Sequence, residues 1–307
     1  SWRDLDVLER ADARGDLTLR VSVAVPATDW AELSERIDAR GRGTEHLQWG
    51  SVKAFVDGSL GSGTARFHEA FDDLPGQRGL VVTDLEQLQA DVERAWDAGI
   101  QPIVHAIGDA AVDWLVDVYA GLGPGAADTP PPRIEHAQHL APDTAERMAR
   151  SGAIASVQPS HLVADAPWLE RRLGRDRAAR AYAVRTLDEA GVPLAFGSDW
   201  TVAPLDPLAG IRAATRRVSV DGKVFEPDER VSVARAVAAS TVGAANAAGF
   251  RGVTGLLAPG SCADFVVLDA VGHEERHALD PYSGLGDAHV VRTFVAGTQV
   301  YEEEMGR

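Results

Sequence analysis

The 307-residue chain has a single cysteine, Cys262, which excludes an intrachain disulfide. The sequence therefore gives no support to an oxidising compartment, and a cytoplasmic location is expected. No apolar run reaches the roughly 18 residues that a membrane span needs. Basic residues are also scarce, with 30 Lys and Arg against 46 Asp and Glu and a formal net charge of −16. Because such acidity repels phosphate backbones and anionic lipids, neither nucleic acid nor a membrane is an expected partner.

The composition that remains is typical of a globular protein with a sizeable core. Hydrophobic residues make up 45% of the chain and charged residues 25%. The chain begins at Ser1 without an initiator Met and without the features of a signal peptide, which favours a processed or truncated N-terminus.

Short apolar runs alternate with longer amphipathic runs along most of the chain. Thr83 and Glu86 form a capping-box pattern, and the helix that they begin is expected to run to about Ala98, before Gly99. This alternation predicts a parallel sheet with helices packed outside it. No glycine-rich phosphate loop follows the first strand, which favours a barrel over a dinucleotide-binding fold. The expected strands are residues 19–25, 51–56, 100–105, 133–136, 153–158 and 193–198.

The C-terminal part has a different pattern. Residues 232–248 read as an alanine-rich helix, and residues 263–268 and 290–302 then read as strands of a small β-structure. Two domains are therefore expected, an α/β barrel over residues 1–250 and a small β-domain over residues 251–307.

Several expected strands end in a side chain that can bind a metal. His105, His136 and Asp199 each close such a strand, and Lys53 lies within an otherwise apolar one. Taken singly, each has an ordinary explanation: a hydrogen-bonded histidine, a helix-capping aspartate or a lysine that reaches outward to water. Parallel α/β barrels, however, gather the carboxyl ends of their strands around one axis. Nitrogen and oxygen ligands brought together there suit zinc and related divalent ions.

Six phrases occur in an informative order and spacing along the chain. They are VKAFVDGSLG (52–61), HAIGD (105–109), RIEHAQ (133–138), SVQPSH (156–161), FGSDW (196–200) and GSCADFVVLD (260–269). Together they resemble the amidohydrolase superfamily, in the branch of large amidohydrolases that includes N-substituted formamide deformylase.

The resemblance implies a TIM-type (β/α)8 barrel and a set of metal ligands. His105 and His136 would be the ligands from the fifth and sixth strands. Lys53 takes the fourth-strand position at which related enzymes carry a carboxylated lysine that bridges two metals. Asp199, on the eighth strand, would bind metal and shuttle a proton. One or two divalent ions, with zinc as the expected metal, would form the cofactor.

The resemblance also implies a reaction. A metal-activated hydroxide would attack the carbonyl of a small non-peptide amide or formamide, and Asp199 would carry the proton to the leaving nitrogen. His161 is expected to contact this substrate, with Asp109 and Trp200 lining or supporting the pocket. Such an enzyme acts on carbon–nitrogen bonds other than peptide bonds.

One feature departs from the family pattern. The first barrel strand of the family ends in a His-x-His pair, and no such pair occurs in this chain. The expectation is therefore an incomplete barrel of strands 3–8 with the remnant of a small β-sandwich. Open sheet edges would favour association, so a homo-oligomer is one expectation. A metal-free fragment without catalysis is the alternative.

A second alternative comes from His273 and His277, which form an H-E-x-x-H pattern like that of zinc metalloproteases. That pattern needs a long helix, on which residues four apart share a face. Here it lies between Gly272 and Pro281 without apolar periodicity, which favours a solvated loop.

Overall fold

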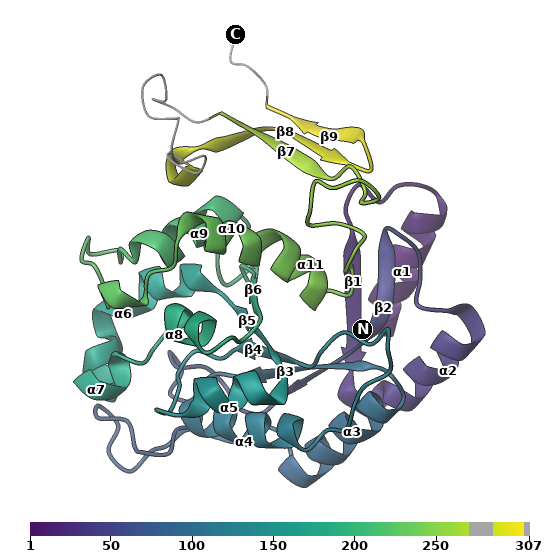
Figure 1. The fold of residues 1–307 in the computed structure, drawn as a ribbon. Helices are drawn as coiled ribbons and strands as arrows, with labels where there is room; N and C mark the ends of the chain where they lie inside the picture. Colours follow the sequence, from purple (N-terminus) through teal and green to yellow (C-terminus); the bar gives the residue numbers. More distant parts are fainter. Residues whose placement is uncertain (270–284, 304–307) are drawn as a thin grey trace.

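The computed structural model describes residues 1–269 and 285–303, and its largest element is a six-stranded sheet (Figure 1). Every neighbouring pair is parallel and the strands lie side by side in chain order. This confirms the α/β class and the parallel sheet expected from the sequence. The strands are β1 (Val21–Pro26), β2 (Leu47–Phe55), β3 (Gln101–Ala106), β4 (Arg133–His136), β5 (Ile154–Val157) and β6 (Leu194–Phe196).

Helices connect these strands, and α1 to α5 follow the outer side of the curved sheet in Figure 1. Short 3-10 turns lie at η1 (Ala27–Asp29), η2 (Pro227–Glu229) and η4 (Leu285–Asp287). The helices are α1 (Trp2–Ala13), α2 (Trp30–Arg40), α3 (Leu85–Asp97), α4 (Asp109–Ala120), α5 (Thr144–Ser151), α6 (Pro159–Leu173), α7 (Arg175–Ala178), α8 (Val184–Glu189), α9 (Pro207–Arg216), α10 (Val233–Ala238) and α11 (Ala244–Ala247).

The core lies between the sheet and these helices. Strand β5 is buried at all four of its positions and β3 at five of six, the pattern of strands that are covered on both faces. Helix α3 shows how local sequence sets an element's ends. Its N-cap is Asp84, whose carboxylate accepts the backbone N–H of Gln87, so the expected cap at Thr83 is one residue too early. Gly99 follows the helix at a positive φ, as expected.

The alanine-rich stretch 232–248 is helical from Val233 to Ala247, as its composition predicts, and Gly249 follows it at a positive φ. The stretch consists of α10, a π-helical turn η3 (Ala239–Gly243) and α11. The hydroxyls of Ser240 and Thr241 donate to carbonyls one turn earlier, which loosens the regular helical ladder. A β-carbon on Gly243 would lie 2.2 Å from the carbonyl oxygen of Leu194, so only glycine lets this turn pack against β6.

A separate antiparallel sheet closes the described chain and lies apart from the six-stranded sheet (Figure 1). It contains β7 (Phe265–Asp269), β8 (His289–Val295) and β9 (Thr298–Glu302), in agreement with the strands expected in the C-terminal part. Arg20, just before β1, joins the two sheets because its guanidinium forms two hydrogen bonds with the carboxylate of Asp264, at 2.5 and 3.0 Å.

The pattern at His273 and His277 lies outside the described residues. Within residues 1–269 and 285–303, no helix is both long enough and apolar enough to cross a membrane. The domain boundary near residue 250 stays a prediction.

Candidate functional site

Both histidines expected at strand ends lie at the carboxyl edge of the six-stranded sheet. His105 is the second-last residue of β3 and His136 is the last residue of β4. The two strands pair in a register that sets Ala106 opposite His136. The imidazole rings consequently meet edge to face, with their centroids 4.5 Å apart. Both histidines thus lie at the ends of parallel strands, as the sequence pattern predicted.

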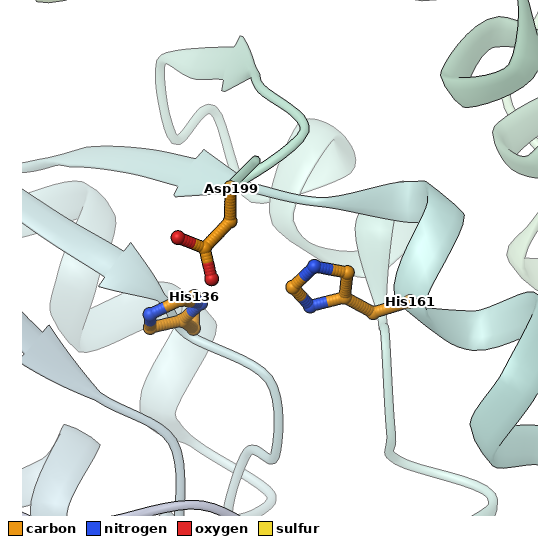
Figure 2. Close-up of side chains that lie close together, drawn as sticks. All are labelled: His136, His161 and Asp199. Carbon is orange, nitrogen blue, oxygen red and sulfur yellow. The ribbon is translucent and has the colours of Figure 1, made fainter. Parts of the chain in front are cut away.

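Three side chains from different elements converge beside this pair. His136, His161 and Asp199 each offer one ligand atom, and these atoms all lie within 4.8 Å of one another. Figure 2 shows them pointing toward a common space, His136 from a strand end, His161 from a helix and Asp199 from a loop. We call them the three-ligand cluster. Two imidazole nitrogens and a carboxylate oxygen are a donor set that suits zinc and similar divalent ions.

Gln158 fixes the orientation of His136. The amide nitrogen of Gln158 donates to the carbonyl of Ser156 at 3.0 Å, so its oxygen must be the atom that meets Nδ1 of His136 at 2.7 Å. Nδ1 therefore carries the imidazole proton, which leaves Nε2 as a free lone pair for a metal. Burial, and then the neighbouring His105, lower the pKa of His136 to about 3, which keeps the ring neutral.

His161 is held by a comparable contact. Its Nε2 lies 3.2 Å from the carbonyl oxygen of Ser198, which can only accept, so Nδ1 is left free to bind. Pro159 opens α6 at a position where its missing N–H costs nothing, and His161 falls in the first turn of that helix. The resemblance to the family implied that His161 contacts the substrate. The structure instead places it within reach of the same ion as His136 and Asp199.

Backbone conformation supports the convergence. His136 has a φ of 77° and Asp199 a φ of 54°, values that are uncommon for residues other than glycine. Such strained residues gather at sites where a side chain must be aimed in a particular direction.

His105 and Lys53 border the cluster without joining it. Nε2 of His105 lies 2.9 Å from the carbonyl oxygen of Gly58 and 3.4 Å from Oδ1 of Asp57, so it faces the loop after β2. The Lys53 amine lies 4.4 Å from the centre of the Phe55 ring. Burial lowers the pKa of Lys53 to about 8. Of the four expected ligands, the structure thus brings together His136 and Asp199, with Lys53 and His105 beside them.

Asp109 and Trp200 occupy different surroundings. Asp109 is buried at the start of α4, and its carboxylate accepts the backbone N–H of His68 at 2.9 Å. Burial raises the pKa of Asp109. Asp109 thereby supports the long loop between β2 and α3. The side chain of Trp200 is 66% exposed and is not among the residues that line the cavity described next.

A cavity of about 720 Å³ opens over the three-ligand cluster. Lys53 and His105 also border it, and most of its remaining wall is apolar. Clefts of this size, with apolar walls and a few convergent polar groups, are typical of small-molecule binding. The apolar side chains of the wall are Phe55, Leu60, Ile107, Val163, Ala164, Val202, Ala203 and Pro204.

Comparison with known proteins identifies the chain. Residues 1–301 match the model of the amidohydrolase family. The chain belongs to the amidohydrolase family. It is 39% identical over 306 residues to Protein LONG AFTER FAR-RED 3 of Arabidopsis thaliana, and this alignment covers 98% of this chain and 52% of the relative. It is 26% identical over 259 residues to N-substituted formamide deformylase of Arthrobacter pascens, over 83% of this chain and 46% of that protein.

A solved structure supports the same assignment. An uncharacterized metal-dependent hydrolase from Pyrococcus horikoshii is similar to this amidohydrolase chain with a TM-score of 0.73 and 30% sequence identity. The match covers 84% of this chain and 52% of the other. The chain thus spans about half the length of the relatives that it matches, and its parallel sheet and helices have a TIM-like arrangement.

Sequence reasoning missed two supporting residues of this amidohydrolase site, Gln158 and Asp57. Asp57 is 1% exposed, and its carboxylate accepts the backbone N–H groups of Arg66, Ile107 and Gly108 at 2.7 to 3.0 Å. It therefore anchors the loop after β2 to the end of β3. Its place directly after a buried strand was a signal that could have found it.

Proposed function

We propose that the protein is a metal-dependent hydrolase that cleaves the carbon–nitrogen bond of a small non-peptide amide or formamide. The observation that carries this proposal is the convergence of His136, His161 and Asp199 at the floor of a largely apolar cavity of about 720 Å³. The similarity to N-substituted formamide deformylase supports the choice of bond.

The residues fit a divalent cation. His136 and His161 each present an unprotonated nitrogen, because their other nitrogens are engaged by Gln158 and by the Ser198 carbonyl. With Asp199 they would hold the cation through two imidazole nitrogens and a carboxylate oxygen, which are ligand atoms that zinc takes in proteins. When bound, such a cation lowers the pKa of a water and polarises a carbonyl oxygen.

Lys53 and His105 remain predicted metal ligands, with Lys53 at the position of a lysine that bridges two metals in related enzymes. Both border the cavity next to His136. A pKa of about 8 leaves Lys53 partly neutral near physiological pH, and the neutral amine is the form that can be carboxylated. Zinc as the metal and carboxylation of Lys53 are both part of the proposal.

Asp199 is proposed as the proton carrier. Its carboxylate is more exposed than the two imidazoles and reaches the cluster from the loop after β6. A carboxylate in this position can take the proton of the attacking water and deliver it to the leaving nitrogen. The apolar side chains of the cavity wall would pack against the uncharged part of a substrate.

The expected architecture and setting belong to the same proposal. The six strands would be strands 3–8 of an eight-stranded barrel, and β7–β9 would be part of a small β-sandwich. The domains would be residues 1–250 and 251–307. The cytoplasmic location and the homo-oligomer are likewise retained as predictions.

The test combines metal analysis with an assay in the full-length protein. We expect at least one equivalent of divalent metal per chain, and release of amine from members of a panel of N-substituted formamides and acetamides. A chelator should abolish this release, and added zinc should restore it. Metal-loaded protein that releases amine from no member of the panel would contradict the proposed reaction. Protein that binds no stoichiometric metal would favour the metal-free alternative.

A further inference from the structure

Asp165 brings a second negative charge to the wall of the cavity. It lies on α6 four residues after His161, so both side chains face the same side of the helix. Both line the cavity, together with Ser160 and Ala164 of the same helix. Asp165 is therefore placed to meet a part of the ligand that lies one helical turn away from the three-ligand cluster.

Two neighbours hold the Asp165 carboxylate in position. Oδ2 accepts the hydroxyl of Tyr182 at 2.6 Å and the amide nitrogen of Gln138 at 3.3 Å. Tyr182 is 6% exposed and Gln138 is 4% exposed, so both donors are fixed in the core. Their hydrogen bonds engage one carboxylate oxygen and leave Oδ1 for a ligand.

Among the described residues, no arginine or lysine forms an ion pair with this carboxylate, and His161, one helical turn away, acts on it only through a charge interaction that lowers its pKa. Both hydrogen-bond donors are neutral, and no ion pair of the described residues includes Asp165. Arg217, which is 1% exposed, donates instead to the carbonyl oxygens of Tyr182 and Phe225. Burial raises the pKa of Asp165, against the opposing effect of the Tyr182 hydrogen bond. A half-buried carboxylate in this state is stabilised by a cation that a ligand supplies.

The rest of the cavity wall indicates which ligand fits. It contains no arginine, and its one lysine, Lys53, belongs to the metal end of the site. An anionic substituent would thus find no partner beside Asp165, whereas apolar side chains such as Leu60 and Val163 would pack an alkyl chain.

We infer that Asp165 binds a protonated amine of the substrate, so that the substrate class is a small amide with an ammonium group at the end of an apolar chain. The inference rests on the proposed hydrolase function and deepens it by naming the charge that the pocket selects. Asp165 is a specificity-determining residue in this view, since it contacts the substrate away from the bond that breaks.

The experiment compares two formamides of nearly equal shape in the metal-loaded, full-length protein. N-(aminobutyl)formamide carries an ammonium group at neutral pH, and N-pentylformamide carries a methyl group in its place. We expect the protein to prefer the first through a lower KM. Asp165→Asn should raise the KM for N-(aminobutyl)formamide on the order of 10-fold to 100-fold, with kcat and the neutral substrate little changed. Glu170→Gln, which removes one charge from an exposed position on the same helix, is the matched control.

The outcomes separate the inference from the function. If both formamides are hydrolysed equally well, or if Asp165→Asn affects both equally, the inference is wrong and the hydrolase proposal stands. If neither is hydrolysed, the affinities of the protein for butylammonium and for butanol are measured separately by calorimetry in place of the assay. Butylammonium binding that is stronger than butanol binding and is lost in Asp165→Asn supports the amine site. Equal binding of the two probes overturns it.

Discussion

The six-stranded parallel sheet and the three-stranded antiparallel sheet of this chain differ first in what covers them. Strand β5 is buried at every position, whereas no position of β7 is fully buried. Helices pack against the first sheet along its length, and the second stands apart from it (Figure 1). The two regions therefore offer the same polar side chains very different environments.

Histidines illustrate the difference. At the parallel sheet, His136 is partly buried, and Gln158 determines which of its nitrogens carries the proton. In the antiparallel sheet, Nε2 of His289 lies 3.0 Å from the Glu303 carboxylate, with both side chains more than 40% exposed. An imidazole whose orientation is already fixed can bind a metal without reorganising. A solvated imidazole must first lose its conformational freedom, which weakens binding. Among the residues that the structure describes, catalysis is therefore expected at the carboxyl edge of the parallel sheet.

The largest expected effect is on turnover. Asp199→Asn should lower kcat by on the order of 100-fold to 10,000-fold, because the amide cannot carry the proton. The fold should persist, as judged by circular dichroism and thermal unfolding. Asp269→Asn makes the same change in β7 and should leave kcat as it is. Equal losses of kcat in the two variants, or retained activity in Asp199→Asn, would contradict the proposal that catalysis takes place at the parallel sheet and depends on Asp199.

Metal affinity should show the same contrast. His136→Ala and His161→Ala each remove one ligand atom of the three-ligand cluster. Each should weaken metal binding by at least about 10-fold, since even residues that only orient a ligand have effects of this size. Metal content after dialysis against graded chelator measures the loss, and His289→Ala serves as the control. If His161→Ala binds metal as tightly as the unchanged protein and His105→Ala binds it more weakly, then His105 is a metal ligand, as the sequence predicted, and His161 is not.

The junction between the sheets should affect stability rather than chemistry. Arg20 and Asp264 form a nearly buried pair, with side-chain exposures of 7% and 16%. Arg20→Ala leaves the Asp264 carboxylate without its cation and should lower the free energy of unfolding by on the order of 1–3 kcal/mol. Arg292→Ala breaks an exposed pair with Glu302 and should cost less than about 1 kcal/mol. Urea unfolding of both variants measures the two losses of unfolding free energy. Equal losses would mean that the contact of β7–β9 with the rest of the protein contributes nothing to global stability.

The smallest expected effect concerns pH. The pKa of Lys53 is about 8 in the folded state and 10.5 when unperturbed, so between these values the unfolded chain binds more protons. The free energy of unfolding contributed by Lys53 should therefore rise from pH 8 to pH 10.5, by on the order of 1 kcal/mol after solvent screening.

Lys53→Met should abolish this rise in metal-free, carbonate-free buffer, whereas Lys223→Met, at an exposed position, should not. Urea unfolding of both variants at pH 7 and pH 10 makes the comparison. An unchanged pH profile in Lys53→Met would mean that the lysine is solvated in the folded protein.

Much of the fold could be predicted from local pattern. All six parallel strands overlap the runs that predicted them, and β3 and β5 follow the rule that a strand covered on both faces is largely apolar. The alanine-rich stretch 232–248 is helical as predicted, but its composition did not predict the π turn at Ala239–Gly243, where Ser240 and Thr241 donate to carbonyls one turn earlier and Gly243 packs closely against β6. Those effects depend on packing that composition does not record.

By itself, the sequence determined that His105, His136 and Asp199 would lie at strand ends or directly after them, since strand length and order follow from hydrophobic pattern. Only the tertiary structure decided which of these side chains meet. Sheet curvature and the start of α6 bring His161 toward His136 and Asp199, while the loop after β2 turns His105 toward Asp57 and Gly58. The physical reason is that ligand geometry depends on side-chain direction and hydrogen-bond partners, and these come from residues distant in the chain.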